Sequence, residues 1–170
     1  MLKSNLAAMA MVATVCSLAA CGQVNLQQAP AAPAAPAAVR LSPSTQTLAG
    51  GYKKVAAPAG AAAYFVNLKD GDVVSSPLLV QFGLRGLGVA PAGVEKDNTG
   101  HHHLLIDVAE VDVNDALPMT DNIRHFGGGQ TEVRVELKPG THTLQLLLAD
   151  HNHIPHHPVV ISERITVTVK

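Results

Sequence analysis

The sequence predicts an all-β fold, an immunoglobulin-like antiparallel β-sandwich, over residues 61–170. Short segments in which apolar and polar residues alternate recur along this region, as in half-buried strands. Turn signals such as Asp70-Gly71 and Pro139-Gly140 separate these segments. No segment of helical length and periodicity competes with them, so strands are expected throughout the domain.

Each expected strand begins at the start of an apolar or alternating run. The first residues lie near Tyr64, Leu78, His101, Thr131, Thr141 and Ile161. The clearest run is TEVRVEL, in which Val133, Val135 and Leu137 alternate with charged residues and would face the core. The runs at 141–149 and 161–169 alternate in the same way, which favours sheets with one buried face.

The Pro-Gly turn before Thr141 sets the expected register of the sandwich. In immunoglobulin-like domains such a turn leads into a strand whose early tyrosine bonds back to the backbone upstream. Here His142 occupies the tyrosine-like place, and an imidazole N–H could donate the same bond. In this register the strands that begin near His101 and Thr141 are antiparallel neighbours in one sheet.

Residues 1–20 are predicted to be a signal peptide. Lys3 is followed by an apolar run over 6–20, which is too short to span a membrane as a helix. The run ends in LAAC, which resembles a bacterial lipoprotein signal with lipidation at Cys21; an ordinary secretory signal is the alternative. A lipid-anchored, periplasm-facing location in the cell envelope is therefore expected, and Gly22 favours the outer membrane.

Residues 21–60 are expected to form a lipidated tether. The stretch QQAPAAPAAPAA favours extended, polyproline-like conformations and offers no bulky side chain to bury. Signal cleavage would remove Cys16, and the lipid would block Cys21. The mature domain would then have no disulfide and no thiolate ligand.

Composition excludes some partners. The chain has 12 Lys and Arg against 13 Asp and Glu and contains no run of basic residues, so nothing attracts nucleic acid. Trp is absent and aromatic residues make up 3%, which leaves few platforms for stacking bases or sugar rings. The membrane, reached through the lipid, and an envelope protein remain as expected partners.

Histidines from three remote segments are expected to meet at one end of the sandwich. Residues 101–103 begin one strand, residues 150–153 end its neighbour, and HFGGGQ at 125–130 leads into the strand near Thr131. These segments bring together the candidate metal ligands His101, His103, His125, His151 and His153. His142 lies at the far end.

Alternation along the strands selects the ligands. His101 and His103 share one face, as would His151 and His153 if their strand continues that far. An H-x-H pair aims two imidazoles the same way, so two pairs could supply four nitrogens to one ion. With no thiolate, this set suits Cu or Zn, and Ni by ligand type.

Several nearby residues have a structural and a functional interpretation. Asp107 and Asp150 could orient imidazoles of the site, or they could be turn and edge charges. His102 faces the apolar side of its strand and is expected to bond a backbone carbonyl at the rim. The glycines at 127–129 are expected to permit a tight loop.

A family resemblance covers residues 63–170. The motifs GHHHLLID, HFGGGQTE, PGTHTLQL and DHNHIPHHP, in this order after KDGDVVSSP, resemble those of a family of bacterial envelope domains of unknown function. The resemblance implies an envelope location and a compact β domain. It implies no activity and no ligand assignments.

Three functions fit these observations, in the following order. The first is an envelope module that binds a transition metal. The second is an interaction or structural module, without metal, whose histidine rim responds to pH. The third is a copper-dependent redox enzyme, which rests on fold analogy alone, because no catalytic triad or carboxylate pair stands out.

Overall fold

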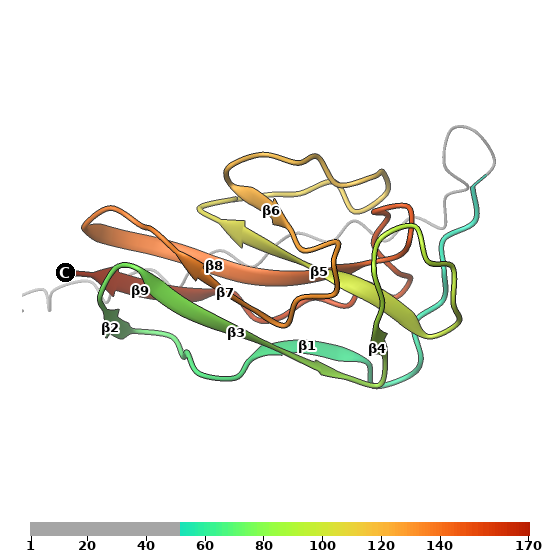
Figure 1. Ribbon diagram of the computed structural model, residues 1–170, viewed down its shortest axis with the longest axis horizontal. Helices are drawn as coiled ribbons and strands as arrows, with labels where there is room; N and C mark the ends of the chain where they lie inside the picture. Colours follow the sequence, from blue (N-terminus) through green and yellow to red (C-terminus); the bar gives the residue numbers. More distant parts are fainter. Residues whose placement is uncertain (1–51) are drawn as a thin grey trace, which may run out of the picture. The chain divides into compact units, whose positions relative to one another are not determined.

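Two sheets built from nine strands make up residues 52–170, the part of the chain that the computed structural model describes (Figure 1). The smaller sheet has the order β1 (Ala62–Phe65), β3 (Leu78–Arg85) and β7 (Glu132–Val135). The larger has the order β2 (Asp72–Val74), β9 (Ile165–Val169), β8 (Gly140–Ala149), β5 (Thr99–Ile106) and β4 (Gly88–Val89), and β6 (Ile123–His125) also pairs with β5. Residues 52–170 contain no helix that could cross a membrane.

The predicted all-β sandwich is confirmed. Strands β5 and β8 pair antiparallel as expected, with His102 opposite Leu148. The last strand begins at Ile165 and not near Ile161, which forms only an isolated bridge to Leu147. The sheets are also not purely antiparallel, because β2 pairs with β9 and β4 with β5 in parallel. Strands β2 and β4 are short, and at the start of each the chain has just crossed from the smaller sheet to the larger.

The main core fills the space between the two sheets. From the larger sheet, alternate residues of β8 and β5 point inward, and Leu104, Leu144 and Leu146 have no exposed surface. Val80 and Val135 meet them from the smaller sheet. Burying each of these side chains contributes roughly 1.5–3 kcal/mol, so a one-residue slip of register would be strongly unfavourable.

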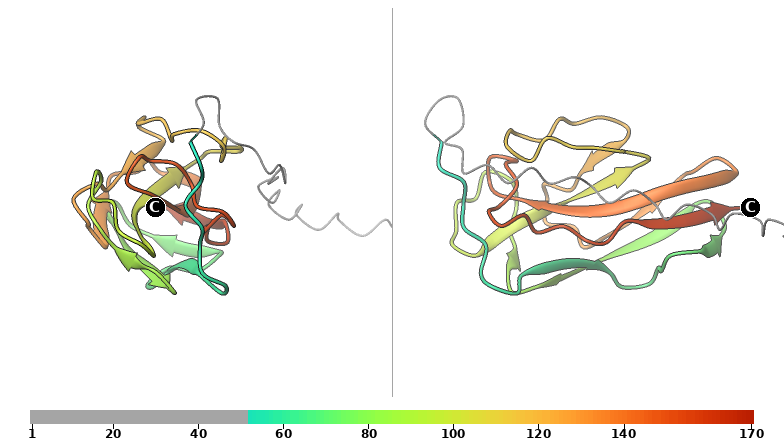
Figure 2. Two further views of the ribbon diagram at one scale, coloured as in Figure 1. Left: turned by 90° about the vertical axis from the view of Figure 1, so that its right-hand side faces the viewer. Right: turned by 180° about the vertical axis from the view of Figure 1, so that it is seen from behind.

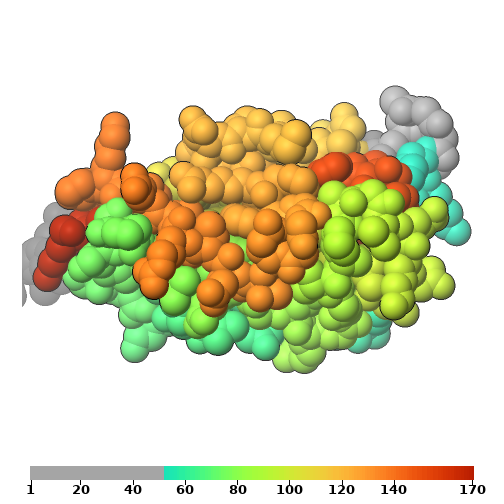
Figure 3. All heavy atoms as spheres, in the orientation of Figure 1, coloured from blue at the N-terminus to red at the C-terminus, as the bar shows by residue number. Residues whose placement is uncertain are grey.

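A second apolar layer covers the outer face of the larger sheet. Leu105 and Leu147 point away from the main core and pack against Leu117 and Ile123. The segment 107–122 lies over this face, on the side of β5 and β8 away from β1 (Figure 2), and forms the gold surface in Figure 3. Strand β5 is therefore buried on both faces, and so are the histidines on it.

The predicted hydrogen bond from His142 back to the upstream backbone is present. Its Nε2 donates a hydrogen bond to the backbone oxygen of Lys138, four residues upstream, at 2.9 Å. Its Nδ1 donates to Oδ2 of Asp107 at 2.7 Å, and the other oxygen of Asp107 accepts from the amide of Thr143. Asp107 thus belongs to the His142 corner, and the expectation that it orients the candidate ligands is wrong. The backbone of Asp107 is left-handed (φ 57°), which takes its side chain out of the alternation of β5.

Candidate metal centre

Strand β5 places His101 and His103 on its outer face. His101 lies opposite Ala149 of β8, and His103 lies opposite Leu147. Both imidazoles have no exposed surface, and their ring centroids are 4.9 Å apart. The prediction that these residues share a face is confirmed, because the strand is regular through both of them.

His125 reaches the same place from β6. It lies directly across from His103, and its ring centroid is 5.2 Å from that of His103 and 4.9 Å from that of His101. Its segment does not simply lead into β7, as expected, but forms a separate strand on the edge of β5. Gly127 makes room for the ring, because a Cβ at this position would overlap the imidazole of His125.

His153 completes the cluster from the turn after β8. Its Nε2 lies 3.2 Å from Nε2 of His125, and its ring centroid is 5.0 Å from that of His101. The backbone of His153 is left-handed (φ 66°), which turns the side chain toward the cluster. We refer to His101, His103, His125 and His153 as the histidine cluster.

The predicted ligand His151 does not join the cluster. Strand β8 ends at Ala149, so the alternation that would have paired His151 with His153 stops before either residue. Nε2 of His151 accepts a hydrogen bond from the side chain of Asn152 at 3.0 Å, and its ring lies edge-on to Tyr52. His151 therefore faces a different environment from His153.

Asp150 supports the cluster through the backbone. Its Oδ1 accepts hydrogen bonds from the amides of Asn152 and Ile154, at 2.8 and 3.1 Å, which closes the turn that carries His153. Its Oδ2 accepts from the hydroxyl of Tyr52. The carboxylate thus shapes the turn and makes no hydrogen bond to an imidazole, contrary to the expected role.

Two further histidines are buried near this end of the sandwich. His102 faces the main core against Phe82, with ring centroids 5.2 Å apart, and neither of its nitrogens has a partner. The expected bond from His102 to a backbone carbonyl is therefore absent. His156 is also fully buried, and its Nε2 donates to the oxygen of Thr99. Gly100 makes this possible, since a Cβ there would lie 2.8 Å from the His156 ring.

Burial keeps the inner imidazoles neutral. Desolvation, together with the neighbouring histidines, lowers the pKa of His101 to about 4 and that of His103 to about 2. Desolvation and the nearby His153 also lower the pKa of His125. A neutral imidazole carries one lone pair on nitrogen, which is the form that binds metal ions.

The donor atoms fit a transition-metal ion. Within residues 52–170, no hydrogen bond of good geometry reaches either ring nitrogen of His101 or His103, although all four atoms are buried. One nitrogen from each of His101, His103 and His125 lies within 4.8 Å of the others. Nε2 of His125 and Nε2 of His153 share a hydrogen bond at 3.2 Å, a separation that also suits two of four tetrahedral ligands, which lie about 3.3 Å apart when bound at about 2.0–2.1 Å. The cluster could therefore hold a metal ion.

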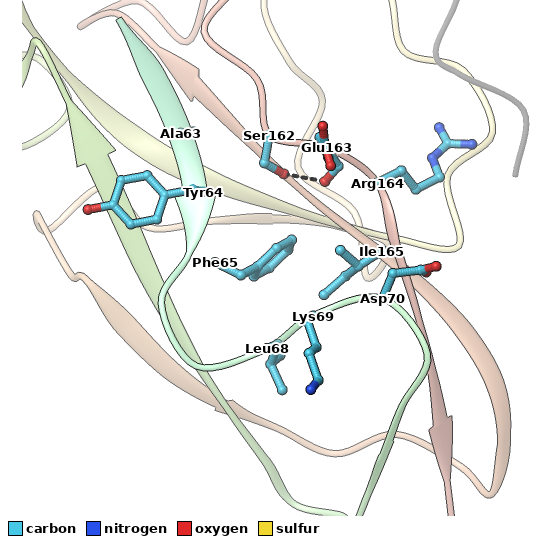
Figure 4. Close-up of a pocket in the computed structure, with 10 residues that line it drawn as sticks. All are labelled: Ala63, Tyr64, Phe65, Leu68, Lys69, Asp70, Ser162, Glu163, Arg164 and Ile165. Carbon is cyan, nitrogen blue, oxygen red and sulfur yellow. Dashed lines mark hydrogen bonds between the residues drawn. The ribbon is translucent and has the colours of Figure 1, made fainter.

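A separate cavity carries no comparable chemistry. A space of about 400 Å³ lies beside β1 and the start of β9, and the residues that line it include Phe65, Ile165, Lys69 and Asp70 (Figure 4). Asp70 is engaged there by the amide of Thr166. No histidine lines this cavity, so it is independent of the cluster.

The fold and the cluster define a class of protein: a β-sandwich whose larger sheet carries buried histidines that could hold a metal ion. A family model described as a domain of unknown function, DUF4399, matches residues 80–170. The match covers more than half of the 170 residues, and the chain belongs to this family. No curated protein and no solved structure matches the chain.

Proposed function

We propose that this protein is a lipid-anchored binding module of the bacterial cell envelope that holds one Cu or Zn ion on the histidine cluster. The observation that carries the proposal is the convergence of four imidazoles from three segments. Two of them are fully buried, and no hydrogen bond of good geometry from residues 52–170 reaches any of their ring nitrogens. Unpartnered buried polar atoms are costly, and coordination of an ion would satisfy one nitrogen of each ring.

The chemistry of the donors supports Cu or Zn over other ions. The cluster offers nitrogen alone, which suits Zn and Cu better than the oxygen-seeking ions Mg and Ca. His101 and His103 are enclosed, whereas His125 and His153 are partly exposed. An ion would therefore enter from the side of His125 and His153 and be held against β5.

The envelope location is supported by the N-terminal sequence, which lies outside the described residues. The apolar run that ends in LAAC and the Ala/Pro-rich segment after it support a lipid on Cys21 and a tether. A Cys21→Ser variant should lose metabolic labelling with fatty acid and leave the membrane fraction. Labelling that persists in this variant would contradict the anchor and leave the metal site untouched.

Metal content tests the binding function. Zn and Cu would be measured by mass spectrometry in the full-length protein, purified without a tag and equilibrated with each ion. One ion per chain is expected. A His101→Ala/His103→Ala double variant should lose it, and this variant also corrects for binding by the two cysteines. Equal metal content in the double variant would refute the proposal.

A further inference from the structure

The segment 52–57, which we call the strap, crosses the end of the molecule beside the loop that carries His153. The left view in Figure 2 shows it in cyan, next to the red 150–161 segment. The amide of Ala57 donates to the oxygen of His157, and the amide of His157 donates to the oxygen of Val55, each at 2.9 Å. The strap precedes β1 and lies outside the range matched by the family model.

Tyr52 connects the strap to the turn that positions His153. Its hydroxyl donates to Oδ2 of Asp150 at 2.7 Å. Asp150 is 1% exposed, and its other oxygen receives the amides of Asn152 and Ile154. One buried carboxylate thus joins the strap to both sides of His153.

Lys54 connects the strap to the second segment that holds His153. Its Nζ donates to the backbone oxygen of Val113 at 2.6 Å and to Oδ1 of Asn114 at 2.8 Å. In the same segment, 107–122, the amide of Leu117 donates to the backbone oxygen of His153 at 2.9 Å. The strap therefore contacts both segments that fix the backbone of His153.

The four histidines differ in how they are held. His101, His103 and His125 lie on paired strands, so the sheet itself sets their positions. His153 lies in a turn, with a left-handed backbone that a residue other than glycine adopts at a cost. Such a conformation persists when surrounding contacts hold it in place.

We propose that the strap is a positioning element for the metal centre: through Tyr52 and Lys54 it holds His153 as the fourth ligand. This inference rests on the proposed metal site. It makes the affinity for the ion depend on the same segment that leads from the N-terminal region into the domain. Without the strap contacts, the ion keeps three histidines and takes water or another ligand in place of His153.

The test compares Tyr52→Phe with Tyr64→Phe in the full-length protein. Both changes remove one phenolic hydroxyl, but Tyr64 lies on β1 and is 47% exposed. Zn affinity would be measured by competition with a chelator. The visible spectrum of bound Co(II), which reports the number and geometry of its ligands, would be recorded in parallel. Tyr52→Phe should weaken Zn binding roughly 10-fold, the size of effect known for residues that orient ligands, and should shift the Co(II) spectrum toward that of His153→Ala. Tyr64→Phe should change neither.

The outcomes distinguish a failure of the strap proposal from a failure of the metal-site proposal. Wild-type binding with identical affinity and spectra in Tyr52→Phe and Tyr64→Phe would overturn the role of the strap and leave the metal site standing. A His101→Ala/His103→Ala variant that binds Zn as tightly as wild type would overturn the site and the strap together. If Tyr52→Phe loses the far-ultraviolet signal of the folded protein, Lys54→Met decides in its place, with Lys53→Met as its matched control on the exposed side of the strap.

Discussion

The two ends of the β5–β8 pair use histidine in opposite ways. At one end, both ring nitrogens of His142 donate, one to the carboxylate of Asp107 and one to a backbone oxygen. At the other end, the rings of His101 and His103 lie against each other, and none of their nitrogens receives a well-formed hydrogen bond from the described part of the chain. The hydrogen bond to Asp107 raises the pKa of His142, whereas burial lowers the pKa of His101 and His103.

This difference in hydrogen bonding and pKa separates a structural histidine from histidines that could bind a metal ion. Carboxylate and carbonyl oxygens only accept, so His142 satisfies them best when both nitrogens carry a proton. No lone pair then remains for a metal ion. The inner histidines of the cluster have the reverse property, since they are neutral and their lone pairs are unused. Each prediction below tests one side of this contrast.

Acid should destabilise the metal-free protein because of the buried histidines. The pKa of His102 is lowered by burial to about 4, so the unfolded chain takes up a proton below pH 6.5 that the folded protein does not. This contribution to stability is present above pH 6.5 and is lost as the pH falls toward 4. His102 alone should cost on the order of 2–3 kcal/mol at pH 4.5. Urea unfolding followed by circular dichroism at pH 7.5 and 4.5, after chelation, measures the change.

A matched variant checks the source of this acid effect. His102→Phe should reduce the loss of stability between pH 7.5 and 4.5, because the substituted ring has no proton to take up. An unchanged pH dependence in His102→Phe would show that other groups cause the loss.

Removing one ligand should separate the two ends in their response to metal. His103→Ala should weaken Zn binding by at least about 100-fold, since even residues that merely orient ligands cost 10–100-fold. His142→Ala should bind Zn as wild type does. Zn at 100 times the wild-type Kd should also raise the free energy of unfolding by ~2.7 kcal/mol in the wild type and in His142→Ala, but by at most about 0.4 kcal/mol in His103→Ala. Equal affinities in the two variants would remove the distinction between the ends.

Much of the fold could be predicted because half-buried strands show their faces in sequence. The alternation over 131–137 and 141–149 corresponds to β7 and β8. Strands β2, β4 and β6 contain two or three residues each, too few for a period of two to appear. The run HHHLLI in β5 is buried on both faces because residues 107–122 cover its outer side. Burial by a loop from elsewhere in the chain produces no alternation of apolar and polar residues within the strand itself.

The site could be predicted where the backbone is regular. His101 and His103 follow strand alternation, and the expected convergence with His125 and His153 is observed. Alternation puts His151 on the face of His153 only if the strand continues past Ala149, and there the hydrogen bonds of Asp150 fold the chain into a turn. The strap contacts could not be predicted either, since Tyr52 and Asp150 are 98 residues apart in sequence.

Gly127 offers a smaller perturbation of the cluster. A Cβ at this position would overlap the ring of His125 and lie 3.1 Å from Cβ of Ala92, so Gly127→Ala should displace the ring. We expect a loss of Zn affinity of roughly 10-fold, less than for the loss of a ligand, because the imidazole remains available. Gly128→Ala is the matched control, since its Cβ would meet only the flexible end of Gln130 at 3.0 Å. Equal Zn affinities in the two variants would mean that the position of His125 does not limit binding.

The smallest effect is expected at His142, and its sign should be opposite to that of the cluster. The raised pKa of His142 means that the folded protein holds this proton more tightly than the unfolded chain, so its stabilisation is present below pH 6.5 and lost as the pH rises through the folded pKa. Asp107 is 42% exposed, so solvent screens the pair, and His142→Gln should cost at most about 1 kcal/mol at pH 6. The cost should shrink by pH 8.5 in urea unfolding of the metal-free protein. A cost that grows with pH would show that His142 acts as a neutral group, and the contrast between the two ends would then rest on hydrogen-bond partners alone.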